Sequence, residues 1–553
     1  SDTLTYSSPS TGDKVGMSHI QPRSRKDVKA RGDAMKVWMD ATCGMLGRSP
    51  DYKNVMVAAW AAAAEVFDRP SFNGSDNIQN FYEYVRENDS TMTHVLVNPQ
   101  VDRSKPAHLQ ESEIVAQIVK ETDAGIIVRG ARMVATLCAL ANEIVVMPAA
   151  VTWHTTETHK TTDYAFGFAI PTSTPGLKFI CRPPVAHFDA ASPMDGPLSL
   201  RYDESDGIAV FDDVLVPWER VFLFRDKEAE AVIRGQTGAG PHALHQSVVR
   251  AASKAEFMMA LALAIAQSTK IDEHNPVQVM LAETISIAEF ARTCRIGAEA
   301  EAHKTKFGTF SPAMRHISLW QSMFWKFYNR QCEIINTLGA GGLVGVPSFA
   351  ELAGGAKKDV EKYFQSINAG SSKRIKLNRL AYDAALSSFA GRQRLYEQYY
   401  SGDPMRTQSL MFRMYPKDEH IQRVHDMLDD LEGRHDLRRL VRQESDVTAE
   451  LRERPDVLVY KLRSLLQAGK SLHERQQGHD EERPPVVTAL VHRPRRQDVV
   501  QEHVPGHRGG PGRRRAGLQR RVDVPLEIAL GQALGLARGE VGLKERQGRL
   551  ELP

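Results

Sequence analysis

Three long segments with the 3.6-residue period of amphipathic helices follow one another in the second half of the chain. They read ALHQSVVRAASKAEFMMALALAIAQST (243–269), VQVMLAETISIAEFARTCRIGAEAEAHK (277–304) and SLWQSMFWKFYNRQCEIINTL (318–338). Each is several turns long and needs a neighbour to cover its apolar face. Consecutive helices of this length predict a helical bundle.

The pattern upstream of the bundle changes twice. Residues 25–84 have mostly helical spacing, and a second helical stretch is predicted over 111–140, after the extended segment HVLVNPQVDR (94–103). Between residues 150 and 225 short β-type runs such as YAFGFAIPTST alternate with Gly, Pro and Asp, which indicates an antiparallel sheet or small barrel. This order is unlike an alternating βαβ pattern and disfavours a doubly wound dinucleotide fold.

These patterns predict a mainly helical α+β protein with three domains and a tail. The predicted parts are a helical N-terminal domain, a central antiparallel β-domain, a C-terminal helical bundle and an Arg/Gly-rich tail, at residues 1–145, 146–235, 236–445 and 446–553. After Tyr460 the tail has no Phe, Trp, Tyr, Met, Cys or Asn, so it cannot readily build a core. We expect it to be disordered, out-of-frame translation or, as a minor alternative, a basic nucleic-acid-binding arm.

Charge and cysteine usage narrow the class of protein. The 71 Lys and Arg residues nearly balance the 68 Asp and Glu residues, which gives a formal net charge of +3 and no charge-based sign of a nucleic-acid or membrane-surface protein. The five cysteines form no C-x-x-C pair, and no apolar run is long enough to span a membrane. A cytoplasmic location is therefore expected.

Familiar catalytic motifs are missing or incomplete. The chain contains no G-x-S-x-G elbow and no Walker lysine, and the glycines of TLGAGGLVGVP (337–347) miss the dinucleotide-binding spacing. His154, Glu157 and His159 in WHTTETH match no zinc signature, so we expect no metal site there.

A polar corner in the N-terminal region is a candidate site. In GRSPDYK (47–53) Gly47 is predicted to end one helix and Ser49 to cap the next, with Arg48 and Tyr52 four residues apart across the turn. Together with His94, Arg48 and Tyr52 could stabilise a phenolate through charge-assisted hydrogen bonds. The alternative is that Arg48 merely caps a helix end.

Five stretches in order resemble one family, the oxygenase components of 4-hydroxyphenylacetate 3-monooxygenase and related two-component phenol hydroxylases. They are GRSPDYK (47–53), HVLVNPQVDR (94–103), KETDAGIIVRGARMVAT (120–136), SPMDGPLSLRYDESDGIAVFDDVLVPWERVFLFRD (192–226) and SSFAGRQRLYEQYYSGDP (387–404). The resemblance runs from about residue 3 to about residue 430. It implies an acyl-CoA-dehydrogenase-like fold, usually a homotetramer.

The resemblance also implies an activity and its cofactor. Such oxygenases take reduced FAD from a separate NAD(P)H-dependent reductase, form a flavin hydroperoxide with O2 and hydroxylate a phenol ortho to its hydroxyl. FMN in place of FAD is left open, and so is the identity of the phenol, because the pocket-shaping loop (147–162) differs from relatives.

The implied site residues fall into two groups. By position in the motifs, Arg48, Tyr52 and His94 are implied to bind the phenolic oxygen. The residues implied to contact the flavin are Gln100, Arg103, Thr136, Gly391 and Arg392, with Thr136 at the flavin N5. By the same resemblance we expect this chain to begin after the family's N-terminal helical segment.

Other functions compete with this interpretation. A 4-hydroxybutyryl-CoA dehydratase needs cluster-ligating cysteines where this chain has Arg48 and Tyr52. An acyl-CoA dehydrogenase would share the fold, and a non-catalytic binding protein could use the basic tail.

Overall fold

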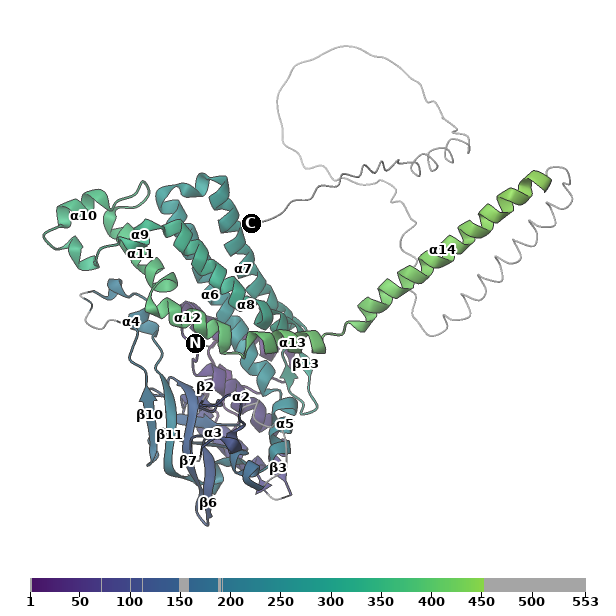
Figure 1. Cartoon of the computed structure of the whole chain (residues 1–553). Helices are drawn as coiled ribbons and strands as arrows, with labels where there is room; N and C mark the ends of the chain where they lie inside the picture. The colour runs from purple at the N-terminus through teal and green to yellow at the C-terminus, as the bar shows by residue number, and fades with distance from the viewer. Residues whose placement is uncertain are drawn as a thin grey trace, which may run out of the picture. The chain divides into compact units, whose positions relative to one another are not determined.

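The computed structural model describes residues 2–451 except positions 71, 100, 112, 149–158, 187–189 and 191. The chain divides into two units, Ser1–Met427 and Leu428–Pro553. In the first unit a β-rich part precedes a helical bundle along the chain, as Figure 1 shows. Of the second unit only the end of helix α14 (Asp418–Leu451) is described, and the predicted tail from residue 452 onward lies outside the described residues. None of the described helices is long and apolar enough to cross a membrane.

Three helices form the N-terminal part. They are α1 (Arg25–Ala41), α2 (Asp51–Ala62) and α3 (Ser75–Glu87). The Ser24 side chain caps α1 by accepting a hydrogen bond from the Asp27 amide, and Asp27 itself lies favourably in the first turn. Nine of the twelve residues of α2 are buried, including the polar residues Asp51, Lys53 and Asn54. This helix therefore places polar groups inside the protein.

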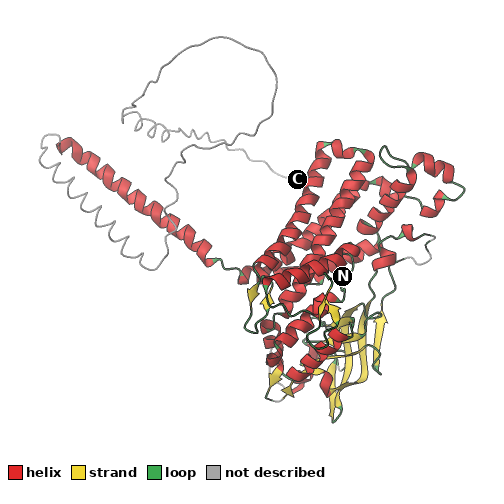
Figure 2. Ribbon diagram, turned by 180° about the vertical axis from the view of Figure 1, so that it is seen from behind, coloured by secondary structure: helices red, strands yellow, loops and turns green. Residues whose placement is uncertain are grey.

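The first unit contains two four-stranded sheets, and Figure 2 shows its strands gathered below the long helices of the bundle. One has the order β10-β11-β7-β6 and is antiparallel throughout. The other has the order β12-β9-β8-β5, in which β5 and β8 are parallel. The strand bounds are β5 (Met92–Val95), β6 (Gln117–Thr122), β7 (Gly125–Thr136), β8 (Glu143–Val146), β9 (Phe166–Pro171), β10 (Leu177–Cys181), β11 (Asp206–Pro217) and β12 (Val221–Phe224). Apolar side chains from both sheets, among them Phe168 and Phe211, share one buried cluster.

The helix predicted over residues 111–140 is wrong, because β6 and β7 occupy most of that stretch. In β7 a run of β-branched residues lies between two partner strands, with buried and half-buried positions largely alternating from Val128 onward. The apolar spacing that suggested a helix also satisfies this pleated arrangement. The strands of the two four-stranded sheets therefore begin at Met92, upstream of the predicted start of the β-domain at residue 146.

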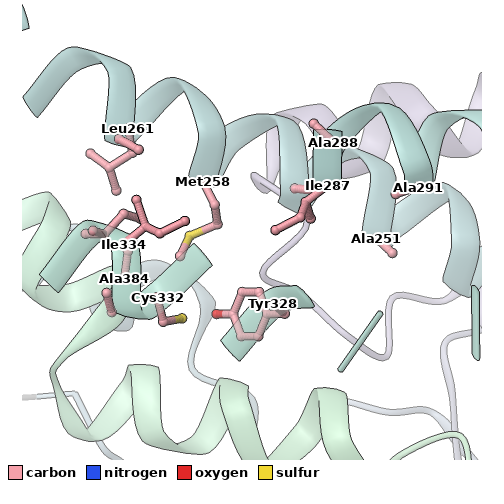
Figure 3. Close-up of a cluster of buried hydrophobic side chains, with 14 of the residues drawn as sticks. Ala251, Met258, Leu261, Ile287, Ala288, Ala291, Tyr328, Cys332, Ile334 and Ala384 are labelled. Carbon is pink, nitrogen blue, oxygen red and sulfur yellow. The ribbon is translucent and has the colours of Figure 1, made fainter. Parts of the chain in front are cut away.

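The C-terminal part is the predicted bundle. Its long helices are α6 (Ala239–Thr269), α7 (Asn275–Ala300) and α8 (Met314–Gly339), with α11 (Ser371–Ala385) and α12 (Ser388–Tyr399) packed against α8. Figure 3 shows apolar residues between these helices, such as Met258 from α6, Ile287 from α7 and Ile334 from α8. The remaining helices are α4 (Ser199–Tyr202), α5 (Lys227–Gln236), α9 (Gly341–Val344), α10 (Lys357–Tyr363) and α13 (Pro404–Met414).

Small two-stranded ribbons complete the described fold. They pair β1 (Thr5–Ser7) with β2 (Lys14–Gly16), β3 (Asp68–Arg69) with β4 (Phe72–Asn73), and β13 (His303–Lys304) with β14 (Phe310–Ser311).

Candidate functional site

The corner between α1 and α2 is longer than the sequence predicted. Helix α1 already ends at Ala41, and Gly44 adopts a positive φ of 64°, so the prediction that Gly47 ends the helix is wrong. Gly47 has a different role, because a Cβ there would overlap the ring of Tyr396. Ser49 does not cap α2 either, since its hydroxyl donates to the Asp51 carboxylate.

Aromatic rings surround the Arg48 side chain. Its guanidinium carbon lies 4.2 Å from the centroid of the Tyr52 ring, 5.2 Å from that of Tyr400 and 5.5 Å from that of Tyr396. Arg48 Nη2 reaches the Tyr400 carbonyl oxygen at 3.4 Å, while the buried Nη1 has no hydrogen-bond partner among the described residues. The rings hold the cation in place and leave one strong donor for an acceptor from outside the described protein groups.

His94 completes this arrangement from strand β5. Its imidazole stacks on the Tyr52 ring, with the centroids 5.7 Å apart and the planes inclined by 22°. Burial and then the positive charges of Lys53 and Arg48 lower the pKa of His94 well below its usual value, so the imidazole is neutral. Arg48, Tyr52 and His94, far apart in the sequence, are therefore brought together.

Two of the predicted flavin-contacting residues share one carboxylate. Thr136 at the end of β7 donates its hydroxyl to Asp206 Oδ1 at 2.9 Å, and Arg392 on α12 donates Nη2 to the same oxygen at 2.8 Å. Although burial opposes ionisation of Asp206, the Arg392 bonds keep the pKa of that carboxyl below its usual range. The Thr136 hydroxyl therefore points its hydrogen at Asp206, and toward any other group it can only accept.

A second buried carboxylate joins the two groups of residues. Glu204 accepts a hydrogen bond from the Arg48 backbone amide at 2.7 Å and pairs with Arg392 Nη1 at 2.6 Å. Its side chain is fully buried. Glu204 thus links the corner that carries Arg48 to Arg392, which shares the Asp206 carboxylate with Thr136.

The other predicted flavin residues are less constrained. Arg103 is exposed, and Gly391 is exposed with open space where a Cβ would project. Gln100, His154 and Glu157 lie outside the described residues, and so does most of the 147–162 loop. Among the residues that the structure describes, no group of His, Cys, Asp and Glu side chains could hold a metal ion.

Sequence reasoning missed several residues that contact Arg48, Tyr52 or Thr136. These are Glu204, Asp206, Tyr396, Tyr400 and Lys53. The signal for the carboxylates was their spacing in RYDESDG, and the signal for the tyrosines was the four-residue interval in YEQYY. Nothing in a single sequence tells which arginine such groups meet.

Two family models match the chain nearly end to end over the described part. The model for the 4-hydroxyphenylacetate 3-hydroxylase N terminal covers residues 1–223, and the model for the C terminal covers residues 233–429. The 4-hydroxyphenylacetate 3-monooxygenase oxygenase component of Thermus thermophilus is 38% identical over 424 residues, which is 76% of this chain and 85% of the relative.

Solved structures give the same result. An oxygenase component of 4-hydroxyphenylacetate 3-monooxygenase, crystallised with FAD and 4-hydroxyphenylacetate, matches at a TM-score of 0.72 and 38% identity, covering 78% of this chain and 88% of that one. A 4-hydroxybutyryl-CoA dehydratase from N. maritimus has a TM-score of 0.68 at 16% identity, covering 78% of this chain and 85% of that one, and shares the fold alone.

Proposed function

From the premise that this chain belongs to the 4-hydroxyphenylacetate 3-hydroxylase family, we propose that Arg48, Tyr52 and His94 hold the phenolic oxygen of its substrate. The chain is the oxygenase component of a two-component flavin-dependent aromatic monooxygenase, with FAD as cofactor, a separate reductase as partner and a phenol as substrate. The observation that carries the proposed roles is the convergence of these three side chains around an Arg48 donor that has no partner among the described residues.

The reaction needs the phenol as an electron-rich nucleophile. One oxygen atom of O2 enters the ring ortho to the hydroxyl and the other leaves as water, with two electrons from bound reduced FAD. Arg48 Nη1 supplies a charged donor, and the buried surroundings strengthen its attraction for a phenolate oxygen. The neutral imidazole of His94 can supply a second hydrogen-bond donor, the N–H of one ring nitrogen, without adding a positive charge.

The proposed flavin site uses Thr136 with its hydroxyl fixed by Asp206. Because that hydroxyl donates to Asp206, its oxygen is free to accept a hydrogen bond from an N–H group, which reduced flavin carries at N5 and oxidised flavin lacks. The fixed direction of this bond favours binding of the reduced cofactor. Gln100, Arg103, Gly391 and Arg392 remain proposed flavin contacts.

The phenol of this chain remains open, as do some wider expectations. Among the named relatives, 4-hydroxyphenylacetate is the recurrent substrate, so a 4-substituted phenol of that type is the first to try. Homotetramer formation, a cytoplasmic location and the bounds of the three domains and the tail are predictions. Size-exclusion chromatography with light scattering would measure the assembly.

The first test asks whether this chain hydroxylates a phenol with reduced FAD but depends on a second protein for NADH oxidation. The chain alone should oxidise no NADH, whereas the same chain supplied with chemically reduced FAD, O2 and 4-hydroxyphenylacetate should form a catechol. Chromatography of the products measures the second outcome and NADH absorbance the first. Rapid NADH consumption without a second protein would contradict the assignment as an oxygenase component.

The second test concerns Thr136. Replacing Thr136 by valine keeps the shape of the side chain but removes one hydrogen bond of about 0.5–1.5 kcal/mol, and should raise the ratio of H2O2 to hydroxylated product up to about tenfold. Thr136→Ser is the matched control, since it keeps the hydroxyl and should keep the ratio. An equal ratio in the valine variant and the natural chain would remove Thr136 from the flavin site.

A further inference from the structure

Lys53 is a buried amine beside the proposed phenol site, and no carboxylate pairs with it among the described residues. Its side chain is on α2, directly after Tyr52, and the residue is only 2% exposed. The one hydrogen-bond contact of its Nζ atom is the Met56 sulfur at 3.4 Å, and a thioether is a weak acceptor. Burying an ammonium group this way is costly unless an anion joins it.

The Lys53 amine faces the same side chains as the proposed phenolic oxygen. Nζ lies 5.5 Å from the centroid of the Tyr52 ring, and His94 stacks on that same ring. The nearest carboxyl in the sequence, Asp51, is bound to Ser49 and Gln246 instead. The Arg48 guanidinium and the Lys53 amine therefore both lie beside the Tyr52 ring, and no carboxylate among the described residues pairs with the amine.

Resting on the proposed phenol site, we propose that Lys53 is a further catalytic residue, the base that accepts the phenolic proton and then pairs with the phenolate. The O–H bond of the phenol breaks, its electron pair stays on oxygen, and a new N–H bond forms on Nζ. Net charge in the site does not change, and the phenolate then lies between the Lys53 ammonium and the Arg48 guanidinium. The ammonium formed on Lys53 and the Arg48 guanidinium thereby share one anion.

The protonation state of the free amine agrees with this role. Burial and then the charge of Arg48 lower the pKa of Lys53 well below its usual value, so the amine gives up its proton more readily than an exposed lysine. The titratable groups that contact it or act on it are Arg48, Tyr52 and His94, and His94 is neutral. Lys53 is therefore the group among them suited to take a proton from the ligand.

The test uses 4-nitrophenol, whose neutral and ionised forms absorb at different wavelengths, and needs neither flavin nor reductase. Bound to the natural chain below the pKa of the free phenol, the ligand should show the ionised spectrum. Calorimetry in buffers of different ionisation enthalpy should then find no proton released, because Lys53 keeps it. An ionised ligand with one proton released per site would overturn the role as base.

Lys53→Met and Lys53→Gln are the decisive variants. In both, the ionisation midpoint of bound 4-nitrophenol should move up by about one to three pH units, the usual effect of losing an opposite charge at close range. Lys29→Met, at an exposed lysine of α1, is the control and should leave the midpoint unchanged. An unchanged midpoint in the folded Lys53 variants would overturn the proposal while leaving the phenol site intact.

Two further measurements distinguish a failure of the Lys53 proposal from a failure of the proposed phenol site. Lys53→Met should raise the melting temperature of the ligand-free chain, because it replaces an unpaired buried amine by an apolar side chain of similar length. A lower melting temperature would mean that the amine has a structural task and would count against a catalytic one. If the natural chain fails to bind 4-nitrophenol, or Arg48→Ala binds it equally well, the proposed phenol site falls and the role of Lys53 with it.

Discussion

Replacing Arg48 or His94 by alanine is expected to slow hydroxylation by about 30- to 1000-fold. Each change removes stabilisation of a buried phenolate, on the order of 2–4 kcal/mol of transition-state free energy. Oxidation of bound reduced FAD by O2 should continue, because neither side chain is proposed to contact the flavin. The oxygen consumed should then appear as H2O2 instead of catechol.

Conservative variants separate chemistry from packing at this corner. Arg48→Lys keeps a positive charge but loses the planar group that packs against Tyr52, Tyr396 and Tyr400, so it should recover only part of the rate. Tyr52→Phe should be milder than either alanine variant, because it keeps the ring and removes one neutral donor.

The measurement is product yield in a single turnover, with H2O2 quantified beside it. If Arg48 only stabilises the corner, Arg48→Ala should lower the melting temperature and still convert its phenol in full. Full yield in both alanine variants would remove these residues from the site.

The sequence predicted the order of the fold well because long segments carry their periodicity locally. The three bundle helices appear where their apolar spacing placed them, as α6, α7 and α8. The prediction failed over 111–140, where the apolar spacing fits a helix as well as a strand and pairing with β11 and β6 decides the structure of β7.

In the candidate site too, the features set by neighbouring residues could be predicted, and those set by tertiary packing could not. Arg48 and Tyr52 could be paired from the sequence because four residues separate them, but the distance to His94 depends on how β5 packs beside α2. Gly47 could be recognised as special, yet the reason is the close approach of Tyr396 from α12, which no local rule contains. Lys53 reads as an ordinary surface lysine until its burial is seen.

Behind Arg48 lies a buried ion cluster that positions the corner. Glu397 on α12 accepts hydrogen bonds from Arg250 Nη1 and Nη2, at 2.5 and 2.9 Å, and from Lys254 Nζ at 2.6 Å, and all three side chains are fully buried. The guanidinium carbon of Arg250 also lies 5.0 Å from the centroid of the Tyr400 ring. The Tyr400 ring in turn stacks on the Tyr396 ring, with the two centroids 4.5 Å apart. The cluster thus supports the rings that contact Arg48.

Glu397→Gln is expected to lower the free energy of unfolding by about 3–5 kcal/mol, because it leaves two buried cations without their carboxylate. The exposed pair of Glu289 and Arg292 offers a matched control, since Glu289→Gln should change the free energy by less than about 1 kcal/mol. Denaturant titration followed by circular dichroism measures both. A loss as small as that of the control would mean that the cations find other partners or lose their protons.

The stability difference between the natural chain and Glu397→Gln should depend on pH. Burial alone would raise the pKa of Glu397, but its bonds to Arg250 and Lys254 lower it from 4.5 to about 2. A carboxyl with a depressed folded pKa contributes stability above its unfolded pKa and loses it as the pH falls toward the folded value. The stability difference between the natural chain and Glu397→Gln should therefore be constant above about pH 5 and shrink between about pH 4.5 and 2. A difference that stays constant through that window would show that the carboxylate charge of Glu397 does not hold the cluster together.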